Sequence, residues 1–183
     1  MIVTSPEWEA FLAGFPGGTI YLLGKSDTGK STFCRYLIER FAPVSRVAYL
    51  DGDTGQSTIG PPATAGLAIY DTDPVTPAAT YLRFVGDISP RGHLLQGLTA
   101  LKRLQETARE FHPRVCVIDS PGYVGGDAAR EYQVSQIELL RPDHLVAIQE
   151  QEELSEILAQ FRNHPAIRVH RFRVSPAVKK RSR

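Results

Sequence analysis

The chain has 183 residues, of which 42% are hydrophobic, and its formal net charge at pH 7 is +1. This length suits one domain and is short for two. No apolar run approaches the roughly 18 residues that a membrane-spanning helix needs, and the N-terminus lacks the basic and apolar pattern of a secretory signal. We therefore expect a single soluble domain over residues 1–183, located in the cytoplasm and without a membrane partner.

Apolar runs alternate with amphipathic stretches along the chain, as in successive β-α units. The run at 115–118 is β-branched and uninterrupted, which is typical of a central parallel strand covered on both faces. Residues 167–174 alternate apolar and basic side chains and indicate an edge strand with one basic face. We predict strands at 19–23, 47–50, 81–85, 115–118, 144–148 and 167–174, and helices at about 30–41, 92–110, 128–140 and 152–162.

The passage at 60–77 is rich in Gly, Pro and Thr. It is too long for an idle connection in a compact domain, so we predict a loop that contributes to a site. The overall pattern predicts an α/β fold of the P-loop NTPase type, with three layers and a mainly parallel central sheet between helices. In such sheets ligands bind at the carboxyl ends of the strands, where every motif described below falls.

Residues 24–31 read Gly-x-x-x-x-Gly-Lys-Ser and lie between a predicted strand and a predicted helix. The glycines let backbone amides point at phosphate oxygens, and the helix N-terminus adds partial positive charge. Lys30 is expected to reach the β- and γ-phosphates, the Ser31 hydroxyl to ligate Mg²⁺, and Thr32 to contact the α-phosphate. The predicted nucleotide-binding residues are Gly24, Lys25, Ser26, Asp27, Thr28, Gly29, Lys30, Ser31 and Thr32.

Acidic residues end two of the predicted strands. Asp119 closes an apolar strand at the position where P-loop proteins hold the magnesium shell. Asp51 and Asp53 end another, and two carboxylates beside a phosphate loop are costly unless a cation or a proton transfer uses them. We interpret Asp53 as a general base and predict that Ser31, Asp53 and Asp119 hold Mg²⁺. For Asp51, capping of the next turn is an alternative.

Hydrolases, transport motors, GTPases and kinases share this phosphate loop. A guanine-specific GTPase would need an Asn-Lys-x-Asp motif, and the only asparagine, Asn163, is followed by His164. Small-molecule kinases remain open. After Glu156 the chain has no acidic residue, and this basic stretch suits a polyanion or, alternatively, a solvated tail. Its cations are Arg162, Arg168, Arg171, Arg173, Lys179, Lys180, Arg181 and Arg183.

Four segments carry a resemblance to a known family and occur in that family's order. The chain resembles the polynucleotide 5′-hydroxyl kinases, which include the RNA kinase subunit of the pre-mRNA cleavage factor and its nucleolar and prokaryotic relatives. The resemblance covers most of the chain and extends over the catalytic domain alone. The segments are residues 24–35, residues 51–56 with Pro61-Pro62, Phe84-Val85-Gly86 with Ser89-Pro90, and Asp119-Ser120-Pro121-Gly122-Tyr123.

The resemblance implies transfer of the γ-phosphate of ATP, with Mg²⁺, to single-stranded RNA or DNA with a 5′-hydroxyl end. Asp53 would take the proton of the attacking hydroxyl. Arg181, in a basic lid segment at about 174–183, would stabilise the transferred group together with Lys30. A monomer is favoured.

The resemblance also implies residues that bind the acceptor strand. The family's Thr-Pro-Gly-Trp clasp corresponds to residues 120–123 here, where Tyr123 replaces the tryptophan and can still stack on a base. The residues predicted to bind the acceptor are Gln56, Arg91, His93, Ser120, Pro121, Gly122 and Tyr123.

Two other functions compete with the kinase. A dimeric ATPase switch of the partitioning and metal-insertion type carries a signature lysine at the position of Lys25, which would cross the dimer interface to the phosphates of the neighbouring subunit. In that case Asp53 would sense hydrolysis. A nucleic-acid-binding module without turnover is the third possibility, but it would not need the complete phosphate and magnesium set. The clasp and the basic lid favour the kinase.

Overall fold

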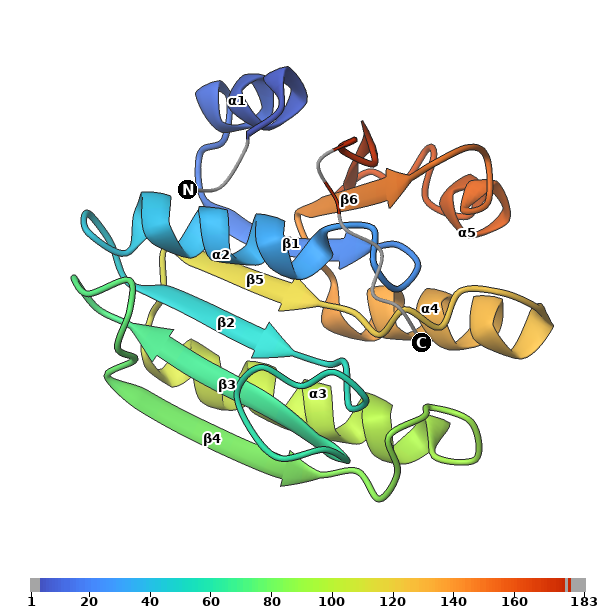
Figure 1. Cartoon of the computed structure of the whole chain (residues 1–183), viewed down its shortest axis with the longest axis horizontal. Coiled ribbons are helices and arrows are strands. Elements are labelled where there is room, and N and C mark those ends of the chain that lie inside the picture. Colours follow the sequence, from blue (N-terminus) through green and yellow to red (C-terminus); the bar gives the residue numbers. More distant parts are fainter. Residues whose placement is uncertain (1–3, 177, 179–183) are drawn as a thin grey trace.

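The computed structural model describes residues 4–176 and 178. Within this part of the chain, the centre is a seven-stranded sheet in the order β4-β3-β2-β5-β1-β6-β7 (Figure 1). The five strands from β2 to β7 in this order run parallel, whereas β3 is antiparallel to both β2 and β4. The strands are β1 (Gly18–Leu23), β2 (Val47–Asp51), β3 (Thr64–Tyr70), β4 (Ala79–Phe84), β5 (Val115–Asp119), β6 (His144–Gln149) and β7 (Arg168–Arg173).

Helices cover both faces of the sheet and make the molecule three-layered (Figure 1). One apolar cluster joins α1 and α2 to one face, and a second cluster joins α3, α4 and α5 to the other. The predicted fold class, α/β with a mainly parallel sheet between helices, is thereby confirmed. The helices are α1 (Pro6–Ala13), α2 (Lys30–Phe41), α3 (Leu94–Glu110), α4 (Asp127–Leu140) and α5 (Ser155–Ala159).

Strand β1 shows why both faces are covered. Ile20 and Leu22 point into the cluster with α1 and α2, whereas Tyr21 and Leu23 point into the cluster with α3, α4 and α5. All four side chains have no exposed surface. Because burying one such apolar side chain contributes roughly 1.5–3 kcal/mol, this strand is stable only between two helical layers.

The prediction of a loop over 60–77 was wrong, because β3 lies inside this passage and is buried over six of its seven residues. Small residues hide the strand in the sequence. Ile59 lies so close to the backbone that a Cβ atom on Gly66 would be 2.7 Å from the Ile59 Cβ. The glycine is therefore required by close packing of the preceding segment against β3.

The predicted acidic helix at 152–162 is also shorter than expected, since only Ser155–Ala159 is helical. The Glu153 carboxylate accepts hydrogen bonds from the amides of Glu150 and Gln151, at 3.1 and 2.8 Å. These bonds hold the preceding residues in a turn, so the helix begins only after it. The edge strand predicted at 167–174 is confirmed as β7, which pairs with β6.

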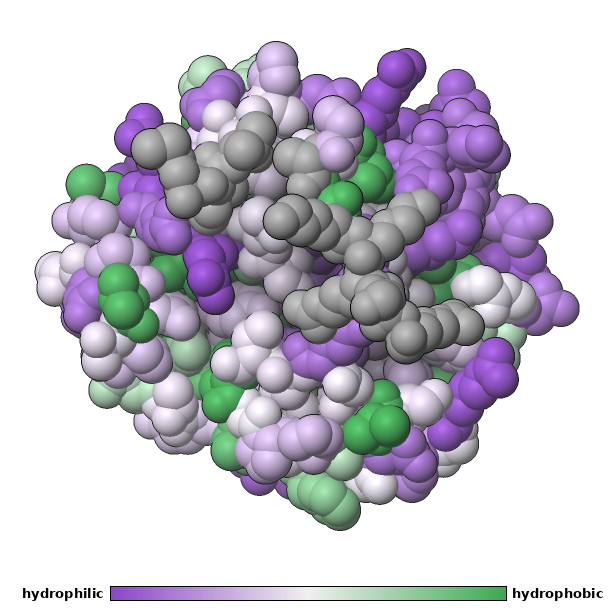
Figure 2. Space-filling model, viewed as in Figure 1, coloured by the Kyte–Doolittle hydropathy of each residue, from purple (hydrophilic) through white to green (hydrophobic). Residues whose placement is uncertain are grey.

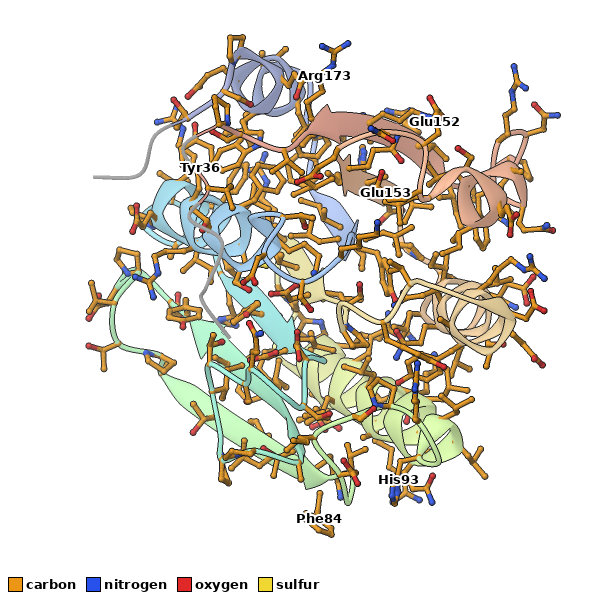
Figure 3. All side chains as sticks on the ribbon, turned by 45° about the vertical axis from the view of Figure 1, so that its right-hand side comes forward. Tyr36, Phe84, His93, Glu152, Glu153 and Arg173 are labelled. Atoms are coloured by element: carbon orange, nitrogen blue, oxygen red, sulfur yellow. The ribbon has the colours of Figure 1, made fainter. Side chains whose placement is uncertain are left out.

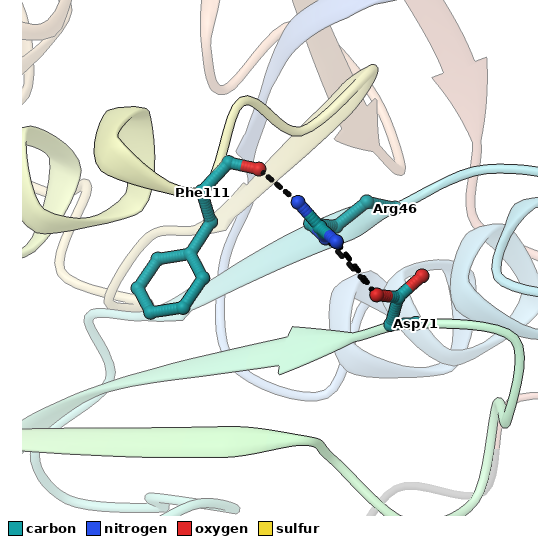
Figure 4. A network of polar contacts seen from close by, with 3 residues as sticks. All are labelled: Arg46, Asp71 and Phe111. Carbon is teal, nitrogen blue, oxygen red and sulfur yellow. Dashed lines mark hydrogen bonds and ion pairs between the residues drawn. The ribbon is translucent and has the colours of Figure 1, made fainter.

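A polar network fastens the antiparallel strands to the parallel part of the sheet (Figure 4). Arg46, just before β2, donates from Nη2 and Nε to Asp71 Oδ2 at 2.7 and 3.3 Å. Its Nη1 donates to the carbonyl of Phe111, at the end of α3, at 2.7 Å. The network lies at the amino ends of the parallel strands, opposite the edge where the sequence motifs gather.

On the face shown in Figure 2, the surface differs between the two ends of the sheet. Figure 2 shows mainly hydrophilic residues over α5 and mainly pale residues with separate hydrophobic ones over β3 and β4. No helix within the described residues is long and apolar enough to span a membrane.

Candidate active site

The phosphate loop connects β1 to α2 at the carboxyl edge of the sheet. Lys30 is 5% exposed, and its Nζ donates to the carbonyls of Gly24 and Lys25, both at 2.9 Å. The Thr28 hydroxyl donates to the same Lys25 carbonyl at 2.9 Å. These bonds hold the ammonium group across the loop, as phosphate binding requires.

Both loop glycines are required by geometry. A Cβ atom on Gly24 would lie 2.7 Å from the Ile148 carbonyl oxygen and from the Thr28 hydroxyl. Gly29 has a φ of +96°, which side chains rarely adopt, and it precedes the first turn of α2. The predicted order of strand, glycine loop and helix is thus confirmed.

The carboxylates of Asp51 and Asp119 lie on neighbouring strands. Asp51 pairs with Asp119 in the register of β2 and β5, and both side chains are 1% exposed. The Ser31 hydroxyl donates to Asp119 Oδ2 at 2.7 Å, which joins the phosphate loop to the end of β5. The structure therefore brings together Ser31 and Asp119, two of the three residues predicted to hold magnesium.

The carboxyl group of Asp119 has a raised pKa. Burial raises its pKa to about 7, although the charge of Lys30 and the hydrogen bond from Ser31 act in the opposite direction. The neighbouring charges of Asp51 and Asp53 add to the increase. Its second oxygen, Oδ1, is buried and has no hydrogen-bond partner in the described part of the chain. A cation at Oδ1 would lower the pKa of Asp119 and would give this buried oxygen a partner.

Asp51 organises the loop that carries Asp53, as the capping alternative predicted. Its Oδ1 accepts from the Asp53 amide at 3.1 Å, and its Oδ2 accepts from the Thr58 amide and hydroxyl at 2.5 and 2.8 Å. Burial raises its pKa, and these hydrogen bonds offset the increase only in part. Thr58, which the sequence analysis missed, is a second anchor of this loop.

Asp53 is more accessible than the other two carboxylates. Its Oδ1 accepts from the amides of Gly55 and Gln56 at 3.2 and 3.1 Å, and the side chain is half-buried. Such a local turn fixes the orientation of the side chain without burying its charge. The arrangement suits a carboxylate that exchanges a proton with a bound substrate.

The segment at 120–123 packs directly against the phosphate loop. A Cβ atom on Gly122 would lie 2.5 Å from the Ser26 amide nitrogen, so the two loops touch through their backbones. Gln133, fully buried in α4, donates from Nε2 to the carbonyls of Pro121 and Tyr123, both at 3.0 Å. Sequence reasoning missed Gln133, whose one signal is a polar side chain on the buried face of a helix.

Of the three other residues predicted to bind the acceptor, Gln56 belongs to the Asp53 turn, and Arg91 and His93 have different surroundings. Arg91 lies over the ring of Tyr123, with its Cζ 5.7 Å from the ring centroid. The His93 ring instead packs against Gly86, where an added Cβ would lie 3.2 Å from the histidine Nδ1. Figure 3 shows His93 at the start of α3, beside the end of β4. Arg91 therefore lies beside the clasp, and the His93 ring packs against the loop that carries Arg91.

Lys25 lies in the phosphate loop, and the segment after β7 lies next to this loop. Burial raises the pKa of Glu153, but amide hydrogen bonds from Glu150 and Gln151 outweigh burial, and with the charge of Lys25 they lower that pKa below its usual value. A Cβ atom on Gly29 would lie 3.2 Å from Val178 Cγ2, so the segment after β7 reaches the loop. The predicted lid residue Arg181 lies outside the described residues.

Within the described residues, no group of three or more His, Cys, Asp or Glu side chains could hold a metal ion. A P-loop magnesium site does not require such a group, because a hydroxyl, the phosphates and water supply most of its ligands.

The chain is similar to known proteins in sequence and in fold. The sequence model of the family described as mRNA cleavage and polyadenylation factor CLP1 P-loop matches residues 24–183. A polyribonucleotide 5′-hydroxyl-kinase of Pyrococcus horikoshii is 35% identical over 171 residues, which are 90% of this chain and 45% of that protein. A protein of the same description from Methanocaldococcus jannaschii is 33% identical over 170 residues, again 90% of this chain and 45% of that protein.

Among solved structures, the wild-type Clp1p–Pcf11p complex is similar, with a TM-score of 0.71 and 16% sequence identity. The match covers 96% of this chain and 48% of the other, and at this identity it shows the fold. The chain thus spans about half the length of the relatives that it matches.

Proposed function

Because this chain belongs to the mRNA cleavage and polyadenylation factor CLP1 P-loop family, we propose that it is an ATP-dependent polynucleotide 5′-hydroxyl kinase. The acceptor would be the 5′-hydroxyl end of single-stranded RNA or DNA. The names of the archaeal relatives support this reaction. The observation that carries the proposal is the direct contact between Gly122 of the clasp and Ser26 of the phosphate loop, which would hold an acceptor beside the γ-phosphate.

The phosphate loop would bind the triphosphate of ATP through its amides and Lys30. Lys30 is already held at the loop by two carbonyls, so little side-chain freedom is lost when phosphate oxygens replace them. Its positive charge would stabilise the negative charge that develops on the transferred group.

The site fits a magnesium ion, because Asp119 Oδ1 is buried and has no hydrogen-bond partner among residues 4–176 and 178, and the Ser31 hydroxyl lies 2.7 Å from Oδ2 of the same carboxylate. We propose Ser31 and Asp119 as its holders, with Asp53 from the neighbouring loop. When bound, the ion would neutralise charge between the phosphates.

Asp53 would act as the general base. As the 5′-oxygen forms its bond to the γ-phosphorus, the proton of the hydroxyl passes to the Asp53 carboxylate, and the bond from the γ-phosphorus to the bridging oxygen breaks to release ADP. The two hydrogen bonds that Oδ1 accepts from backbone amides would keep the carboxylate oriented during this step. Gln56, next to this turn, is proposed to lie near the acceptor end.

The clasp would position the terminal nucleotide. Tyr123 offers a ring for base stacking, and Arg91 next to it adds positive charge for the strand's phosphates. Gln133 would keep the clasp backbone in place through its two hydrogen bonds. Arg181 is proposed as the lid cation that would act with Lys30.

If the chain were an ATPase switch, the clasp at residues 120–123 would have no function. This point favours the kinase over the switch, in which Lys25 would reach the phosphates of a neighbouring subunit.

The proposal is tested by transfer of label from γ-labelled ATP to 5′-hydroxyl RNA and DNA oligonucleotides with Mg²⁺, with Lys30→Ala as the control. We expect labelled strand with the wild type alone, and the ratio of RNA to DNA product gives the acceptor class. Release of labelled inorganic phosphate without labelled strand would instead support the ATPase switch.

A further inference from the structure

Large apolar side chains lie exposed where β4 ends at the carboxyl edge of the sheet. Phe84, the last residue of β4, is 78% exposed, and Ile88 in the following loop is 59% exposed. Figure 3 shows Phe84 pointing away from the body of the molecule. An aromatic ring this exposed at the end of a strand has no packing role, so its surface is available to a ligand.

This surface is joined to the loop of the proposed general base. A Cβ atom on Gly55 would lie 2.8 Å from the Ile88 carbonyl oxygen, so the Asp53 turn and the loop after β4 touch. The amides of Val85 and Gly86 donate to the Ala63 carbonyl at 2.9 and 3.3 Å, and the Ala63 amide donates to the Thr54 carbonyl, next to Asp53, at 2.9 Å.

The same loop also reaches the clasp. It runs from Phe84 through Ile88 to Arg91, whose guanidinium lies over the Tyr123 ring. Phe84 thus lies at the start of this loop, and Arg91, near the end of the loop, lies over a second aromatic ring, that of Tyr123. Asp87 is the one acidic residue between residues 84 and 93. Its carboxylate accepts a hydrogen bond from the Ser89 amide at 2.9 Å.

We infer that Phe84 and Ile88 form a second stacking platform, which binds a base of the acceptor strand downstream of the nucleotide held by Tyr123. The inference rests on the proposed function. A nucleic-acid strand fits this surface because an aromatic ring stacks on any base and Arg91, in the same loop, would meet the phosphates. The loop touches the Asp53 turn through the Ile88 carbonyl and carries Arg91 to the Tyr123 ring, so one strand could follow it.

If Phe84 and Ile88 bind a base, phosphorylation of the acceptor strand should depend on an internal base as well as on the terminal one. We would measure phosphorylation of a 5′-hydroxyl oligonucleotide of about ten nucleotides, within the site sizes of single-strand binders. A single abasic residue is moved from the 5′ end inward. The wild type is expected to lose efficiency at the terminal position, through Tyr123, and at one internal position, through Phe84.

Phe84→Ala is expected to raise the acceptor KM about fivefold to tenfold, the low end of stacking effects because the ring is exposed on one side. The KM for ATP should stay unchanged. The variant should also become insensitive to the internal abasic residue and stay sensitive to the terminal one. Phe84→Tyr should retain the wild-type behaviour, whereas Phe84→Leu should behave like Phe84→Ala, because leucine is apolar but cannot stack.

The matched control is Val75→Ala, since Val75 is 82% exposed and lies in the turn between β3 and β4, at the opposite end of these strands. Its acceptor KM should equal that of the wild type. Equal activity of the wild type with every internal abasic residue would overturn the platform and leave the kinase intact. A change of oligomeric state in Phe84→Ala, measured by light scattering, would overturn it in favour of a surface between two copies of the chain. Absence of labelled strand with any oligonucleotide would overturn the proposed function itself.

Discussion

The parallel centre of the sheet and its antiparallel edge differ in burial and in what they offer to a ligand. All five residues of β5 are buried, whereas five of the six residues of β4 are exposed. The parallel strands end in Asp51, Asp119 and the phosphate loop, where burial raises the pKa of the two carboxylates. The antiparallel edge ends in an exposed aromatic ring. We infer that the centre supplies the phosphate chemistry and the edge supplies surface for the acceptor.

The largest effect is expected where the two regions meet, at Asp53. Asp53→Asn should lower kcat by about 10²- to 10⁴-fold, the range of general-base catalysis, because an amide cannot take the proton. Affinity for ATP measured without Mg²⁺ should stay unchanged, since the amide oxygen can still accept the hydrogen bonds from Gly55 and Gln56. Single-turnover label transfer and calorimetric ATP titration check the two statements. Full activity in this variant would remove Asp53 as the base.

The next largest effect concerns stability at the buried centre. The pKa of Asp119 is raised to about 7, so between about pH 4 and pH 7 the folded protein binds more protons than the unfolded chain. Stability of the nucleotide-free and magnesium-free protein should therefore fall as the pH rises through this window. Asp119→Asn keeps the shape of the side chain without its charge.

At about pH 8, Asp119→Asn should be more stable than the wild type, by on the order of a few kcal/mol, and the two should converge near pH 4. It should also be inactive if Asp119 helps to hold Mg²⁺. Urea unfolding at several pH values measures the difference. Identical pH profiles for the two proteins would contradict the burial of a titrating Asp119.

A smaller effect is expected where the clasp touches the phosphate loop. Gly122→Ala places a methyl group 2.5 Å from the Ser26 amide nitrogen, so one loop must move. Overpacking of this kind costs about 1–3 kcal/mol. If this cost falls on the arrangement that holds the acceptor, kcat/KM should fall about fivefold or more. Gly125→Ala is the matched control, because nothing lies within 4 Å of its Cβ position. Equal activity of the two variants would mean that the contact does not position the acceptor.

The smallest effect is expected at Arg46, which attaches the antiparallel strands to the parallel part of the sheet. Arg46→Ala removes the ion pair with Asp71 and the bond to the Phe111 carbonyl. The paired side chains are 39% and 43% exposed, so the loss of stability should be about 1 kcal/mol. Activity should be unchanged, because the network lies at the end of the sheet opposite the site. Thermal unfolding and label transfer on the same sample check both statements.

Sequence patterns predicted the parallel centre well because its strands are uninterrupted apolar runs and its glycine loop has a fixed spacing. Residues 115–118 are an example, since burial on both faces leaves no place for a polar residue. Strand β3 escaped prediction because its small residues allow Ile59 to pack on its backbone, which makes a buried strand look like a loop.

The site was predictable to a similar extent. The Ser31–Asp119 pair follows from strand order, since the ends of parallel neighbours meet. The anchors Thr58 and Gln133 depend on tertiary contacts that leave no local pattern. The placement of His93 was equally hidden, because its ring is held by Gly86 from a different turn of the same loop.

The most direct test of the central claim compares ATP consumption with two matched oligonucleotides, one with a 5′-hydroxyl and one with a 5′-phosphate. If the parallel centre and the antiparallel edge together serve phosphoryl transfer to a strand end, ADP should form in proportion to newly phosphorylated strand and only with the 5′-hydroxyl oligonucleotide. Equal ADP formation with both oligonucleotides, or without either, would contradict the claim and identify the chain as an ATPase.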